Sequence, residues 1–107
     1  LKRAIYLLHL AGHDVAVENN TAMPTDFLVA QMELREAVAD ARASREENAL
    51  DRLRGELKAR MKTQYAALGA ALDAHDNHEQ AADLARRLMF EEKLLQEIDD
   101  ALEAMDA

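Results

Sequence analysis

The sequence predicts an all-α protein, an antiparallel three-helix bundle preceded by a short N-terminal helix. Its 107 residues contain one Pro and three Gly among abundant Ala, Leu, Glu and Arg, a composition typical of helices. Apolar residues recur at the three- and four-residue spacing of an amphipathic helix, whereas the two-residue alternation of a half-buried strand is missing. Short connections between long helices then favour antiparallel neighbours.

The first twelve residues predict a short helix that ends in a glycine. Ile5 and Leu8 lie on one side of this helix, and Gly12 follows where a left-handed C-cap residue would sit. Residues 13–23 show no apolar period and contain two consecutive asparagines, so we expect a loop there. Leu1 in place of Met suggests that the chain begins partway through a longer one.

The first long helix is expected to begin at Pro24 and to run to about Ala43. Proline suits the first turn of a helix, and Thr25 or Asp26 can accept hydrogen bonds from its free backbone amides. Its expected core stripe comprises Phe27, Gln31, Leu34, Val38 and Ala41.

Two capping boxes are expected to open the other long helices. Ser44 with Glu47 matches the first box and predicts a helix over about 45–73; the second box, at Asn77, predicts a last helix that reaches about Met105. The core stripe of the middle helix comprises Leu50, Leu53, Leu57, Met61, Gln64, Leu68 and Leu72. That of the last helix comprises Ala81, Leu84, Leu88, Leu95, Ile98, Leu102 and Met105.

Charge and composition narrow the class of protein. Residues 1–43 carry four basic and six acidic side chains, residues 44–72 six and four, and residues 73–107 three and eleven. A basic middle helix between two acidic ones weakly favours the antiparallel pairing. The net charge of −8 argues against nucleic acid and against an anionic membrane surface, and no apolar run approaches a membrane span. The chain has no cysteine, which fits a cytoplasmic protein.

The first long helix carries more apolar residues than its core stripe needs. Measured around the helix from Phe27, Leu28 falls at about 100°, Met32 at about 140° and Val29 at about 200°. With a rise of about 1.5 Å per residue, Phe90 of the last helix comes out level with Val29 and Met32. Phe90 also lies off its own stripe.

Three carboxylates share that outer face. Glu33 falls at about 240°, Glu36 at about 180° and Asp40 at about 220°. An apolar cluster with a charged rim is typical of a protein-binding surface. Alternatively, Leu28 and Met32 belong to a core packed on two sides, for instance against the N-terminal helix. Periodicity alone slightly favours this second interpretation.

Patterns that could indicate catalysis or metal binding have simpler explanations. Residues 75–79 (HDNHE) could suggest a metal site but are more typical of a polar loop. His9 and His13 are separated by the glycine expected to end the first helix. Tyr6 and Tyr65 are expected at the boundary of the core. With no nucleophile–base arrangement or glycine-rich phosphate loop in view, we expect no enzyme, cofactor or metal.

Three stretches, RAIYLLHLAGHDV, FLVAQMELREAV and AADLARRLMFEEKL, resemble the C-terminal part of the HscB family. These are J-type co-chaperones of iron–sulfur cluster assembly, and the resemblance covers essentially the whole chain. It implies that residues 24–107 form a bundle that binds the cluster scaffold protein IscU, and that residues 1–12 are the end and junction of a J domain. A His-Pro-Asp motif is absent. We therefore expect scaffold binding without stimulation of the partner chaperone HscA, which the absent J domain would engage.

The resemblance also implies the scaffold-contact residues. They fall on Leu28, Val29, Met32, Glu33, Glu36, Asp40 and Phe90. Val29, Met32 and Asp40 are conservative departures from the family pattern, and the other four match it. Because these are the residues that geometry left without a role, we favour a scaffold-binding surface. The alternative is a self-associating dimerisation module whose apolar face meets its own copy across a two-fold axis.

Overall fold

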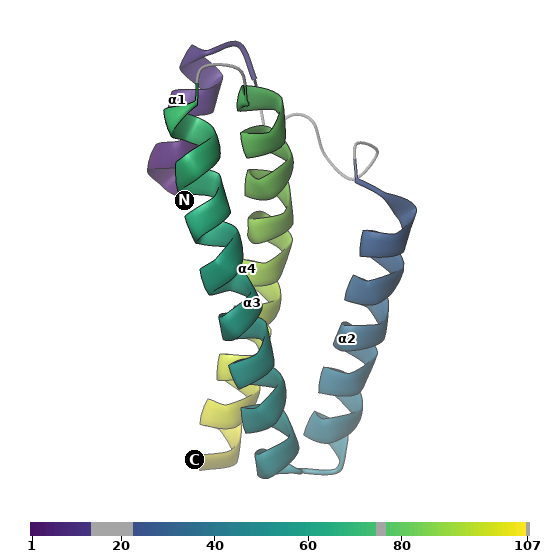
Figure 1. Cartoon of the computed structure of the whole chain (residues 1–107). Coiled ribbons are helices and arrows are strands. Elements are labelled where there is room, and N and C mark those ends of the chain that lie inside the picture. Colours follow the sequence, from purple (N-terminus) through teal and green to yellow (C-terminus); the bar gives the residue numbers. More distant parts are fainter. Residues whose placement is uncertain (14–22, 75–76, 107) are drawn as a thin grey trace.

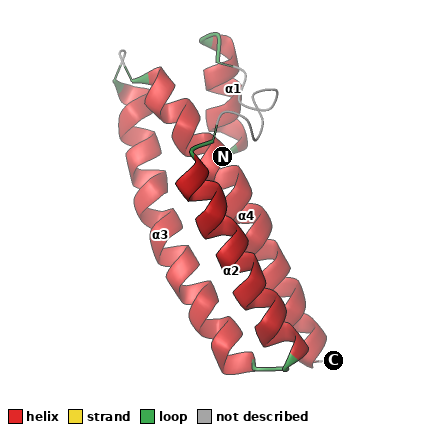
Figure 2. Cartoon of the chain, turned by 90° about the vertical axis from the view of Figure 1, so that its right-hand side faces the viewer, coloured by secondary structure: helices red, strands yellow, loops and turns green. Residues whose placement is uncertain are grey.

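The computed structural model describes residues 1–13, 23–74 and 77–106. Within these ranges the chain is helical, without strands, as the sequence predicts (Figures 1 and 2). Apart from its ends, His13 and Met23, the expected loop over 13–23 lies outside the described residues. The helices are α1 (Lys2–Leu10), α2 (Thr25–Ala43), α3 (Glu47–Asp73) and α4 (His78–Asp106).

The three long helices form the predicted up-down-up bundle. Helix α3 packs along α4, and α2 contacts both of them, running parallel to α4 (Figure 1). Helix α1 packs on α4 at the end of the bundle where α3 turns into α4. The result is a rod with principal extents of 47 × 23 × 19 Å. No helix among the described residues is both long and apolar enough to cross a membrane.

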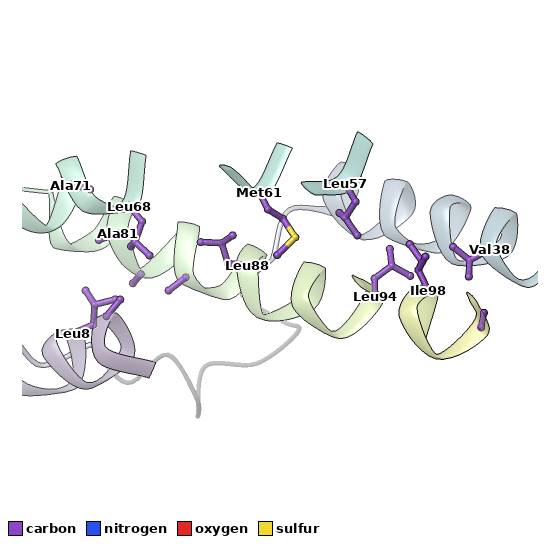
Figure 3. Close-up of a cluster of buried hydrophobic side chains, with 14 of the residues drawn as sticks. Leu8, Val38, Leu57, Met61, Leu68, Ala71, Ala81, Leu88, Leu94 and Ile98 are labelled. Carbon is purple, nitrogen blue, oxygen red and sulfur yellow. The ribbon is translucent and has the colours of Figure 1, made fainter. Parts of the chain in front are cut away.

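The predicted stripes face one another in the core. Figure 3 shows Val38 of α2, Leu57 and Leu68 of α3, and Leu88 and Ile98 of α4 in a continuous line of buried side chains. Burial of such side chains stabilises the folded state by about 1.5–3 kcal/mol each before the loss of chain entropy. The continuity of this line confirms the helical periodicity.

The stripe predicted for α4 was too narrow. Leu94 is completely buried and Leu95 only partly so, and Ala82, Ala85 and Ala101 are buried as well. The reason is that α1, α2 and α3 all pack against α4, so that it buries more of its circumference than a helix with one neighbouring surface.

Gly12 ends α1 as expected. Its φ is +94°, its amide donates to the carbonyl of His9 over 3.0 Å, and the amide of His13 donates to the carbonyl of Leu8 over 2.8 Å. These two bonds form a Schellman motif, which satisfies carbonyls that the helix leaves free.

The capping box expected at Ser44 is wrong. Ser44 is the C-cap of α2, Arg45 has a φ of +54°, and the amide of Glu46 donates to the carbonyl of Ala41 over 2.9 Å. The chain therefore reverses through a second Schellman motif, and α3 begins at Glu47 without a side-chain cap. Because an arginine takes the left-handed position that glycine usually occupies, no residue in the sequence signals this turn.

At the start of α2 the N-cap residue, Pro24, makes no side-chain cap, but Asp26 accepts a hydrogen bond as predicted. The carboxylate of Asp26 accepts a hydrogen bond of 3.0 Å from the amide of Phe27. This bond satisfies one of the backbone amides that the first turn of a helix leaves free. Asn77 directly precedes α4, and its backbone carbonyl accepts from the amide of Ala81 over 2.9 Å.

Candidate partner-binding site

The outer face of α2 carries exposed apolar side chains. Met32 is 68 % exposed and Val29 is 47 % exposed, while Leu28 is half-buried. The alternative in which Met32 belongs to the core of the bundle is therefore wrong, and for Leu28 it holds only in part. Val29 and Met32 are three residues apart and therefore neighbours on the helix surface, and an apolar patch that is contiguous in this way is typical of a surface that another protein covers.

Phe90 of α4 lies beside the first turn of α2. Its ring meets the ring of Phe27 edge to face, with centroids 6.1 Å apart and planes at 75°. Further along, the guanidinium of Arg35 pairs with the carboxylate of Glu97 over 2.8 Å. Arg35 lies eight residues after Phe27 and Glu97 seven after Phe90, so α2 and α4 keep a parallel register. Phe90 is thus level with Phe27, about one turn from the Met32 level that helix rise predicted.

Three carboxylates continue the outer face of α2 towards its C-terminus. Glu33, Glu36 and Asp40 are all exposed, and their spacing places them along the same side of the helix as Val29. We use the term patch for the seven predicted residues. It comprises Leu28, Val29, Met32, Glu33, Glu36 and Asp40 on α2 and Phe90 on α4.

A cation lies directly behind the apolar end of the patch. The guanidinium carbon of Arg87 is 4.9 Å from the centroid of the Phe27 ring, a distance at which the cation is attracted to the ring face. The carboxylate of Asp83, one turn earlier in α4, accepts from the Nε of Arg87 over 3.0 Å. The sequence predicts Phe27 in the core stripe and no role for Arg87, because the spacing of three residues between Arg87 and Phe90 gains meaning only once the contact between the two rings is known.

A buried carboxyl was also missed. Glu91 is completely buried in α4, and burial raises the pKa of its carboxyl, while Arg60, Gln64 and Arg87 act in the opposite direction. Position 91 lies three residues after Leu88 and four before Leu95, so the predicted stripe passes through it. Its place on that stripe was therefore readable from the sequence.

The two tyrosines differ from each other. Tyr65 of α3 is half-buried, as expected, and its hydroxyl donates to the carboxylate of Glu92 in α4. Burial, followed by the effect of Glu92, raises the pKa of Tyr65. Tyr6 is 61 % exposed on α1, so its expected place at the core boundary is wrong; α1 turns Ala4 and Leu8 towards α4 instead.

Two of the histidines, His13 and His78, lie in contact. The rings of His13 and His78 meet edge to face with centroids 6.2 Å apart. His75 lies outside the described residues, and the residues that the structure describes contain no group of three side chains suited to hold a metal ion. The ring pair links the end of α1 to the start of α4.

Comparison of the sequence with known proteins identifies the family of this chain. A family model described as the HSCB C-terminal oligomerisation domain matches residues 23–99. The chain belongs to the HscB family. HscB relatives include proteins of Azoarcus sp., with 51 % identity, Paraburkholderia xenovorans, with 46 %, and Ralstonia nicotianae, with 45 %, each over 106 residues.

Each of these three HscB relatives carries the name co-chaperone protein HscB homolog. Each alignment covers 99 % of this chain but 60 % of the relative. The chain therefore spans about three fifths of the length of these relatives. No solved structure matches it. The seven-residue patch lies within the part of the chain that the HscB family model covers.

Proposed function

We propose that the patch binds an iron–sulfur cluster scaffold protein of the IscU type. In the full-length, cytoplasmic co-chaperone, a J domain joined through residues 1–12 would bring the bound scaffold to a DnaK-type chaperone of the HscA type. The observation that carries the proposal is the exposure of Met32 and Val29 on the outer face of α2, the helix whose first turn contacts Phe90 through the Phe27 ring. The family name of the relatives supports the co-chaperone role.

The two parts of the patch would contribute differently to binding. Leu28, Val29, Met32 and Phe90 would lose water on contact, and a few such apolar anchors usually carry most of the affinity of an interface. Glu33, Glu36 and Asp40 would attract a basic surface on the scaffold and mainly raise the association rate. The expected partner surface is therefore an apolar depression with a basic margin.

Truncation of the two most informative apolar side chains tests this proposal. Met32→Ala and Phe90→Ala should each weaken scaffold binding by about 1 kcal/mol or more, measured by calorimetry with purified IscU-type protein. A matched control is Leu10→Ala, because Leu10 is 64 % exposed on α1 and away from the patch. The control should bind as the unmodified chain does. If the Met32/Phe90 double variant keeps both its helical circular dichroism and full affinity, the proposal is wrong.

Self-association is a second candidate function. It is favoured by the description of the family model as an oligomerisation domain and by the apolar face of α2, which could meet its own copy across a two-fold axis. Sedimentation separates the candidates: a concentration-independent monomer that binds the scaffold supports the first. A dimer that Met32→Glu dissociates supports the second.

A further inference from the structure

The first half of α2 is held to the bundle by few side chains. The buried residues of α2 are Gln31, Val38 and Ala41, so in its first half the only fully buried side chain is an amide, and the Oε1 of Gln31 lacks a hydrogen-bond partner. Phe27 and Leu34 are half-buried. Segments with little apolar burial open locally at low cost in free energy. The apolar end of the patch lies on this thinly packed half.

A line of contacts runs from α4 to that half of α2. Asp83 holds the Nε of Arg87 at 3.0 Å, the Arg87 guanidinium lies 4.9 Å from the Phe27 ring centroid, and the Phe27 ring meets Phe90 edge to face. The side chain of Arg87 is 28 % exposed. Partial removal of water strengthens the attraction between a cation and an aromatic ring.

These contacts restrict the side-chain rotation of Phe27 and Phe90 and so hold their rings in place. An edge-to-face pair restricts both rings to one relative orientation, and a side chain that is already ordered loses less entropy when a partner binds. Phe90 belongs to α4 and the other six patch residues belong to α2. The Phe27 ring is the contact that joins the two parts at the apolar end.

We propose that Phe27 and Arg87, which are outside the seven patch residues, are positioning residues that hold Phe90 against the first turn of α2 in the orientation the scaffold binds. This inference rests on the proposed function. Phe27 acts through its ring and Arg87 acts through Phe27. Neither residue needs to contact the scaffold.

Two pairs of variants test the roles of the ring and the cation. Phe27→Leu removes the aromatic ring but keeps an apolar side chain, and Phe27→Tyr restores a ring. Arg87→Gln removes the cation, and Arg87→Lys restores one. Scaffold binding is measured by calorimetry, and the Phe27–Phe90 ring contact by nuclear Overhauser effects in the free protein. Arg54→Gln is the matched control, because Arg54 pairs with Asp99 between α3 and α4 without touching the patch.

We expect Phe27→Leu to weaken scaffold binding about fivefold to tenfold and Arg87→Gln about twofold to fivefold. Phe27→Tyr and Arg87→Lys should recover most of the affinity. Arg87→Gln should weaken the nuclear Overhauser effects between the Phe27 and Phe90 rings. Arg54→Gln should change affinity less than twofold. Full affinity in both Phe27→Leu and Arg87→Gln, together with weak binding by Phe90→Ala, would overturn the positioning role and leave the proposed function intact. Full affinity in the Met32/Phe90 double variant as well would overturn both.

Discussion

Glu91 of α4 and Gln64 of α3 bring polar groups together inside the bundle without a complete set of hydrogen bonds. Both carboxyl oxygens of Glu91 and the Oε1 of Gln64 are buried and lack a hydrogen-bond partner of good geometry, although the Gln64 amide favours the charged form of Glu91. A buried polar atom without a partner lowers stability by about 1–3 kcal/mol, and a charged one by more. The core therefore contains a site at which substitution should stabilise the protein.

Glu91→Gln should raise the free energy of unfolding, and by more at neutral than at acidic pH. Burial raises the pKa of Glu91 above its ordinary 4.5, so the folded protein keeps this proton where the unfolded chain has lost it. The favourable contribution is complete below the unfolded pKa and is lost as pH rises through the folded pKa. Urea unfolding at about pH 4 and about pH 8 measures the difference, and we expect a gain of about 1–3 kcal/mol at the higher pH.

The control for this prediction is Glu103→Gln, because Glu103 is an exposed glutamate of the same helix. It should change stability by less than about 0.5 kcal/mol at either pH. A Glu91→Gln gain that is the same at both pH values would show that protonation of Glu91 is not coupled to folding.

Leu94→Ala should destabilise the protein far more than Leu95→Ala. Leu94 is completely buried and Leu95 only partly so, and truncation of a buried leucine leaves a cavity that costs about 2–5 kcal/mol. The same substitution at neighbouring positions is its own control for helix propensity. Thermal unfolding measures the loss of stability in each variant. Equal losses in the two variants would contradict the burial pattern of α4.

Arg45→Gly should raise stability by about 0.5–1 kcal/mol, because an arginine in the left-handed region is strained and glycine is not. Arg45 has a φ of +54° and Gly12 a φ of +94°. Gly12→Ala should have the opposite effect, about 1–2 kcal/mol, and for backbone reasons alone, since an added Cβ meets no atom within 4 Å.

Arg52→Gly is the matched control for Arg45→Gly, because Arg52 is exposed inside α3. There, the same substitution should lower stability by about 1 kcal/mol. Calorimetric unfolding of the variants provides the comparison, and a loss of stability in Arg45→Gly would contradict the turn geometry.

Glu36→Lys should slow scaffold association without changing the stability of the bundle. Glu36 is exposed on α2, and reversal of one charge at the margin of an interface acts mainly on the association rate. Stopped-flow association at low and high salt measures this, because screening shortens the reach of the charges at high salt. We expect the unmodified chain to lose more of its rate on addition of salt than the variant does.

The sequence was sufficient for the architecture because the helical stripes are long and regular. Val38, Leu57, Leu68 and Ile98 occupy the core as their spacing predicts. The burial of Leu94 was missed because a stripe drawn for one neighbouring surface does not describe a helix that three others contact. Ser44 was misjudged because a serine can begin one helix or end another, and the left-handed Arg45 that decides between them has no propensity signal.

The candidate site was also predicted only in part from the sequence. Helical spacing placed Val29 and Met32 off the core stripe, but for Met32 it slightly favoured a second core contact, and the resemblance to the HscB family was needed to favour a binding surface; both residues are exposed. Spacing did not predict the contact between Phe27 and Phe90, because ring orientation depends on the relative rotation of α2 and α4. Arg87 could be noticed only once that contact had been located.

The parallel register of α2 and α4 has a practical consequence for inhibitor design. Six patch residues come from a single short stretch of α2, and Phe90 is contributed by a helix that begins at His78. A synthetic peptide that copies α2 would therefore reproduce most of the surface chemistry but lack its aromatic neighbour, and isolated peptides of this length are only marginally helical in water. A molecule that mimics the patch would need a second segment that carries a phenyl group level with the first turn of the α2 copy.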